Sequence, residues 1–454
     1  MGYDVIAWLF TAVAGLLIIA LPRKWAVLPL FAVAFLIPLA QRIVIAGLDF
    51  SMVRLLIIVG FLRLLTTRSP HPWKMNAIDK AMVLWMLSAV ITYSLLWQTS
   101  GAFINRLGVA LDTLGIYFLI RGFVSDLESF DLVIRAFVYL SLLVAAAMLV
   151  EWVTGRNGFF VFGGVPQFTE VREGRMRAQG AFMHPIMAGT FGASLFPLFF
   201  SLAWAGGKRK LLALVGMSAA VVITVTSASS TPAMAFLAGV AALCCWPLRR
   251  RMRMIRWGML CGFIALDLVM KAPVYALIGR IDVAGGSTGF HRQYLMEQFF
   301  KRFDEWWLVG VKSTEDWGPK FLVMHDVTNQ FIRVAVDGGL LTLGMFILVI
   351  ALCFRDVGRA RLAFEKDPAT ERLCWAFGAS LVVHLTAFQG SSYFDQMIVV
   401  WYSGLALIAS LAAFAQNQGA PVPQKEKVQA VSSKWVQRSK PVAPVASWNR
   451  YANR

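Results

Sequence analysis

Charged side chains are scarce in this chain. They make up 15% of its 454 residues, whereas hydrophobic residues make up 58%. Long apolar stretches with so little charge indicate a polytopic membrane protein rather than a large soluble core. Negative charges are fewer than positive ones, with 25 Asp and Glu against 43 Lys and Arg. The bases cluster in short connections between apolar runs, as the positive-inside rule describes, so we predict no nucleic-acid partner.

Several other signals are missing. The five cysteines form no CxxC pair and have no histidine at ligand spacing, which argues against a disulfide framework and a zinc site. No GxxxxGK[ST] and no GxGxxG segment marks a nucleotide-binding domain. No fixed-period repeat is evident, which weakens an inverted-repeat transporter. We therefore predict no metal and no cofactor.

The apolar runs are about long enough to cross a hydrocarbon core of roughly 30 Å. They predict an all-α fold, a polytopic transmembrane helix bundle with twelve or thirteen spans. The first run lacks a basic n-region and a small-residue cleavage site, so we expect a retained helix rather than a signal peptide. The runs lie at 5–21, 25–40, 48–65, 81–97, 105–123, 132–153, 184–205, 211–227, 232–248, 255–270, 334–354, 373–388 and 397–416.

The distribution of Lys and Arg predicts which connections face the cytoplasm. Basic segments such as "GKRK" and "RRRMRMIR" fall on one side of the predicted bundle. The other side carries two long connections, 154–183 and 271–333, and the second is expected to be large and partly helical. Residues 1–416 are predicted to form one transmembrane domain that includes both connections. The tail, 417–454, reads as disordered, basic and cytoplasmic; it either rests on anionic lipid or has no partner.

The segment "RMRAQGAFMHP", Arg175 to Pro185, leads into an apolar run at the predicted outer face. His184 and Pro185 look like a helix start, because proline suits the first turn. Arginine binds phosphate through a fixed fork and keeps its charge, so this segment predicts an anion site. The alternative is that these arginines only pair with nearby acids or reach lipid head groups. The residues concerned are Arg172, Arg175, Arg177, Glu170 and Glu173.

The longer outer connection carries a second group of polar residues. "HRQYLMEQFFKRF" has helical apolar spacing and places Arg292 in the first turn. His325 and Asp326 then lead into the next membrane run, and histidine is the natural proton acceptor near neutral pH. The alternative for His325 is a partly buried histidine bonded to backbone at a helix entry. Tyr393, in the short connection "QGSSYFD", lines an acceptor path or fits an interfacial aromatic belt equally well.

Four segments together resemble the bacterial O-antigen ligase and O-antigen polymerase superfamily of membrane glycosyltransferases. In this order they are "RAQGAFMHP", "GGSTGFHRQYLMEQFF", "LVGV" and "MHDVTNQFIRVAVDGGLLTLG". The resemblance implies that Arg177, Arg292 and His325 are catalytic. Asp326 stands where Asn is more usual in the family, and "TSASSTPA" lacks the arginine often found after its serine. The expected substrate-binding residues are Arg175, His184, His291, Asp326, Asn329 and Tyr393.

The resemblance implies an inverting, metal-independent transfer from an undecaprenyl-diphosphate-linked glycan to a hydroxyl group. The site would lie on the periplasmic side of a bacterial inner membrane. A polymerase of O-antigen or exopolysaccharide is favoured over a ligase that uses lipid A core. Membrane lipids and a chain-length regulator are the other expected partners. A transporter of polysaccharide or lipid-linked sugar is the rival from another class, and predicts functional charges near the membrane midplane.

Polar residues inside the apolar runs have simpler interpretations. Arg106 and Asp112 are not stacked on one helix face, so each is expected to pair with another helix. Glu151 and Asp267 lie near outer ends and are expected to face water, with a proton relay as the alternative. His384 is expected to be a hydrogen-bonded packing residue.

Overall fold

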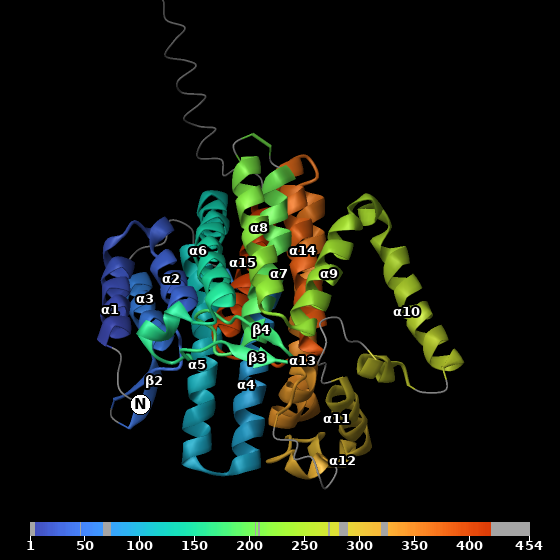
Figure 1. Cartoon of the computed structure of the whole chain (residues 1–454). Coiled ribbons are helices and arrows are strands. Elements are labelled where there is room, and N and C mark those ends of the chain that lie inside the picture. Colours follow the sequence, from blue (N-terminus) through green and yellow to red (C-terminus); the bar gives the residue numbers. More distant parts are fainter. Residues whose placement is uncertain are drawn as a thin grey trace, which may run out of the picture.

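The computed structural model describes residues 5–45, 47–66, 74–204, 206–207, 209–270, 273–280, 289–318 and 326–418. Within these residues the chain is a bundle of α-helices with two short antiparallel hairpins (Figure 1). The all-α polytopic fold predicted from sequence is confirmed, and the protein is a multi-pass membrane protein. His325 and residues 419–454 of the predicted tail lie outside the described residues.

Each predicted apolar run contains a helix, but fewer of these helices are full spans. Among the residues that the structure describes, seven helices are long and apolar enough to cross a membrane. An eighth span results if α9 (Ser230–Cys244) and the segment Trp246–Val269, bent by 72°, count as one. The seven are α4 (Ala77–Trp97), α5 (Ser100–Phe123), α6 (Leu127–Thr154), α7 (Pro185–Trp204), α8 (Arg209–Thr226), α13 (Gln330–Ala363) and α15 (Gln396–Gln418).

Counted by length and composition, the described helices give seven or eight spans, fewer than the twelve or thirteen predicted, because several runs are interrupted. Two helices near the start are shorter than their runs, α1 (Val5–Ala20) and α2 (Leu28–Leu36). The third run loses its first residues to the hairpin of β1 (Arg42–Ile45) and β2 (Leu48–Ser51), so α3 begins at Met52. The 21-residue α14 (Pro368–Phe388) has length but not enough apolarity.

The basic connections gather at one end of the bundle. Lys24 contacts Glu128 at the start of α6 at 2.8 Å, and Arg209 at the start of α8 contacts Asp131 at 3.4 Å. Arg249, after α9, contacts Glu371 at the start of α14 at 3.3 Å. We call this the basic end. The opposite end, the site end, holds the second hairpin, the α8–α9 turn, the α14–α15 connection and the helices α11 and α12 (Figure 1).

Helix α7 lies in the centre and brings the site end together. Its glycines allow close packing, since a Cβ atom on Gly192 would lie 2.7 Å from the Ala220 carbonyl oxygen of α8. A Cβ atom on Gly189 would lie 2.8 Å from Pro232 of α9. The α8–α9 turn is therefore held against the start of α7. The hairpin of β3 (Glu170–Arg172) and β4 (Arg175–Arg177) immediately precedes that start.

The large outer connection is partly helical, as predicted. Its described residues form α11 (Gly289–Lys301), α12 (Phe303–Trp306), η4 (Val274–Arg280) and η5 (Glu315–Trp317). Of these, α11, α12 and η5 share a small apolar core with the first turns of α13. Helix α13 is broken at Gly339, whose φ of 72° and ψ of −174° are not helical. Backbone from the connection fills the break, with Val311 N donating to Val336 O and Leu340 N to Trp307 O, both at 2.8 Å.

Charges within the bundle are paired between helices. Arg106 contacts Asp337 of α13 at 3.2 Å, and Asp112 contacts Arg54 of α3 at 2.6 Å. The predicted pairing of Arg106 and Asp112 with other helices is confirmed. His384 is buried, and its Nδ1 lies 2.7 Å from the Tyr393 hydroxyl, as expected of a packing residue. Helix α10 (Met252–Val269) differs, because it stands away from the bundle and buries none of its residues (Figure 1).

Candidate functional site

Arg177 is buried at the end of β4, with only 4% of its surface exposed. A tight turn through Glu173 and Gly174, both with positive φ, folds β4 back on β3. The Arg177 guanidinium donates to Glu170 Oε1 and to Ser229 Oγ, both at 2.8 Å. Arg177 thus pairs with an acid, as the alternative interpretation expected. Glu170 is half-exposed, however, and the second partner of Arg177 is a neutral hydroxyl. Ser229 is the N-cap residue of α9.

Arg292 reaches the same turn from the other side. It lies on α11, and its Nη2 donates to Thr231 Oγ1 at 3.0 Å. Its Nε is buried and has no partner among the described residues. Burial lowers the pKa of Arg292, and the nearby charge of Arg172 lowers it further. Two arginines from distant segments therefore contact the start of α9, Arg177 through Ser229 and Arg292 through Thr231.

Glu151 organises the segment after Arg177. It was expected to face water, and that expectation is wrong: only 1% of its surface is exposed. The chain turns back over the end of α6, so the carboxylate accepts hydrogen bonds from Gln179 N at 3.2 Å and Gly180 N at 2.8 Å. Asp267, by contrast, is exposed as expected.

Two predicted histidines border the two arginines. His184 Nδ1 accepts from Ile186 N at 3.1 Å and so caps α7. Burial lowers the pKa of His184, and the charge of Arg177 lowers it further, whereas Glu170 and Asp326 act in the opposite direction. His291 Nε2 lies 3.2 Å from the backbone oxygen of Asp326, which is itself exposed. The structure thus places His184, His291 and Asp326 around the arginines.

Two other predicted residues are used by the fold. Asn329 caps α13 by accepting from Phe331 N at 2.9 Å, and its Nδ2 donates to Gln389 at 3.3 Å. The Tyr393 hydroxyl packs against His384 rather than pointing to the arginines, and Tyr393 N donates to Gln330 at 2.7 Å. Both residues fix the connection after α14 against the start of α13.

Asp395 is a residue that sequence reasoning missed. It has a left-handed backbone with φ of 57°, and its Oδ2 accepts from Met183 N at 2.8 Å. Its Oδ1 is buried without a partner among the described residues. Burial raises the pKa of Asp395 to about 7. The sequence shows Asp395 only as an acid at the end of "SYFD", and it takes the fold to reveal that this acid lies beside His184.

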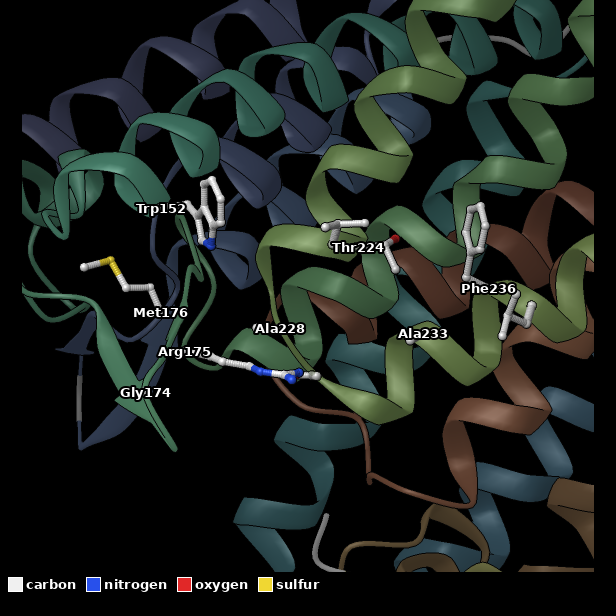
Figure 2. Close-up of a pocket in the computed structure, with 11 residues that line it drawn as sticks. Trp152, Gly174, Arg175, Met176, Thr224, Ala228, Ala233 and Phe236 are labelled. Atoms are coloured by element: carbon white, nitrogen blue, oxygen red, sulfur yellow. The ribbon is translucent and has the colours of Figure 1, made fainter. Parts of the chain in front are cut away.

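An apolar cavity of about 660 Å³ adjoins the site. Its walls come from α6, α8, α9 and the second hairpin, and include Trp152, Val225, Phe236 and Leu237. Its polar lining consists of Arg175, Thr224 and Ser229, and Figure 2 shows Arg175 extending from the hairpin toward the turn at Ala228. Ser229 lines the cavity and also accepts a hydrogen bond from Arg177. The cavity therefore lies directly beside the Arg177 side chain.

The charge of this region suits a polyanion with an apolar part. Four arginines gather here, Arg172, Arg175, Arg177 and Arg292, and fixed guanidinium groups favour phosphate. Over the described part of the chain, no group of three or more His, Cys, Asp and Glu side chains is placed to hold a metal ion.

Comparison of the chain with protein-family models and with curated protein sequences gives no match. The family resemblance therefore rests on the residues of the four sequence segments themselves.

Proposed function

We propose that the protein is a glycosyltransferase of the bacterial inner membrane whose active site faces the periplasm. Its donor is an undecaprenyl-diphosphate-linked glycan, and its product is a longer surface polysaccharide, either O-antigen or exopolysaccharide. One observation carries the proposal: Arg177 and Arg292 meet at the first turn of α9 beside an apolar cavity. A lipid diphosphate needs a cationic site next to an apolar one.

The proposed reaction is a single inverting displacement without metal or cofactor. The acceptor hydroxyl oxygen attacks the anomeric carbon of the donor glycan, and a new C–O bond forms. The bond between that carbon and the diphosphate oxygen breaks, and its electron pair leaves with undecaprenyl diphosphate. The arginines stabilise the charge that develops on the leaving diphosphate. The hydroxyl proton passes to a base, for which His325 is the sequence-based candidate.

A ligase that transfers the glycan to lipid A core is the alternative within this chemistry, because only the acceptor differs. A chain-length regulator is the proposed protein partner of a polymerase.

A transporter of lipid-linked sugar is the rival from another class. Transport favours functional charges within the span. Two described charge pairs away from the site end are satisfied internally, Arg54 with Asp112 and Arg121 with Asp79. Arg292 at the site end has a hydroxyl partner and no carboxylate partner among the described residues, which favours chemistry at that end.

The test is turnover by purified protein in lipid, with undecaprenyl-diphosphate-linked oligosaccharide as donor. A product ladder without lipid A core supports a polymerase, and product only with lipid A core supports a ligase. Folded protein that forms no product under either condition would overturn the proposal in favour of transport.

A further inference from the structure

The two arginines contact different residues of the α9 turn. Arg177 binds Ser229, which lines the apolar cavity. Arg292 binds Thr231, beside Gly390 and on the side of α11 and the outer connection. A Cβ atom on Gly390 would lie 2.5 Å from Thr231 Oγ1 and 3.3 Å from the Arg292 Cζ. The site therefore has a cavity arm, Arg177 with Ser229, and an outer arm, Arg292 with Thr231.

A lipid diphosphate also has two unlike ends. One phosphate is esterified to the apolar chain and the other to the sugar. The apolar chain gains most free energy in the apolar cavity, so its phosphate lies next to the cavity arm. The sugar is polar and takes the side of the outer connection. The first turn of α9 lies between the arms, and helix N-termini favour phosphate.

We propose that the donor binds with a fixed polarity across this turn. The lipid-linked phosphate occupies the cavity arm, and the glycosyl-linked phosphate occupies the outer arm. This inference rests on the proposed function and adds a division of labour between the arginines. The bond that breaks joins the sugar to the outer phosphate, so negative charge develops at Arg292, whereas Arg177 holds the lipid end in both ground and transition states.

Binding of two lipids that differ by one phosphate tests the polarity. Undecaprenyl monophosphate and undecaprenyl diphosphate are titrated against full-length protein in phosphatidylcholine nanodiscs, which supply no anionic head groups. Arg177→Ala is expected to weaken both lipids by about tenfold or more, the value of a lost charge-assisted hydrogen bond. Arg292→Ala is expected to weaken the diphosphate to a similar extent and leave the monophosphate within about twofold. Arg156→Ala, an exposed arginine after α6, is the matched control.

Gly390→Ala gives an independent route to the outer arm. The added methyl displaces Thr231 and Arg292 without removing the guanidinium charge. It is expected to weaken the diphosphate and spare the monophosphate, as Arg292→Ala does. In turnover, Arg292→Ala lowers kcat, whereas Arg177→Ala mainly raises KM.

The outcomes separate the two proposals. Monophosphate binding that depends on Arg292 more than on Arg177, or equally on both, overturns the fixed polarity and leaves the glycosyltransferase proposal standing. Wild-type protein that binds neither lipid overturns both. Monophosphate binding that depends on Arg177 alone supports the polarity.

Discussion

Buried arginines at the two ends of the bundle differ in how they are paired. At the basic end, Arg121 Nε and Nη2 donate to the two carboxylate oxygens of Asp79 at 3.1 Å each, and Nη1 donates to Ser410 at 3.2 Å. Asp79 is fully buried and also accepts from Tyr117 at 2.6 Å. At the site end, Arg292 has a hydroxyl partner and no carboxylate among the described residues.

This difference separates a structural arginine from a binding arginine. A guanidinium has five donors, and a structural one directs them to internal acceptors. Arg121 does so and joins α5 to α4 and α15. Arg292 leaves a buried donor without an internal acceptor, which costs free energy unless a ligand supplies one. The comparison assigns stability to Arg121 and ligand binding to Arg292, and the following substitutions test that assignment.

The largest effect is expected from Arg121→Ala. It leaves the Asp79 carboxylate buried without its cation and is expected to lower the free energy of unfolding by about 3–5 kcal/mol. Thermal unfolding in detergent measures the loss. Arg135→Ala, which removes a more exposed pair with Asp131, is the control and should change little. Equal stability of the two variants would contradict the structural role of Arg121.

Arg292→Ala is expected to have the opposite pattern. Without the guanidinium donors that stabilise the leaving diphosphate, the transfer rate is expected to fall by about 10²- to 10³-fold. The melting temperature should stay near that of wild type. Arg292→Lys keeps the charge without the fork and should recover part of the rate. Single-turnover rates and melting curves on the same samples provide the measurement. A variant that loses stability in proportion to activity would place Arg292 with Arg121.

Glu151→Gln sharpens the comparison, because Glu151 is a buried acid at the site end. It acts as a positioning residue through the backbone amides of Gln179 and Gly180. Replacing a charged acceptor by a neutral one is expected to lower donor affinity and transfer about tenfold. Glu151→Asp, which keeps the charge, should recover more activity than Glu151→Gln. Glu128→Gln at the basic end is the matched control, and equal losses in both Gln variants would argue against positioning.

The smallest effect is expected from Asp395→Asn and depends on pH. The folded protein holds the Asp395 proton up to about pH 7, whereas the unfolded chain releases it near pH 4. The stability from this neutral carboxyl is therefore full below about pH 4 and is lost as pH rises to about 7. Asparagine removes the titration, so the melting temperature of the variant relative to wild type should rise by about 1–3 °C between pH 5 and pH 7.5. Parallel melting temperatures across this range would show that Asp395 does not titrate there.

The sequence predicted helix positions well because apolar length is a local property. The expectation that Arg177 and Arg292 belong to one site came from the family resemblance, whereas residue types alone indicated only that these arginines suit phosphate. Sequence reasoning missed Ser229 and Thr231, since only the packing of α7 against α8 and α9 selects that turn. The sequence analysis predicted that Glu151 faces water, because the apolar run that contains Glu151 does not reveal that residues 154–183 fold back over the end of α6. Full spans were overcounted for the related reason that a hairpin and a short helix look apolar in sequence.

The break in α13 at Gly339 has a consequence for biogenesis. Its two bridging hydrogen bonds need Trp307 and Val311, which leave the ribosome before α13 does. These residues must be folded against α13 before this span is complete, because the helix cannot satisfy its own backbone at that point. Folding of the large connection is therefore coupled to completion of the span, and a deletion that removes Trp307 and Val311 would leave backbone groups of α13 without these partners.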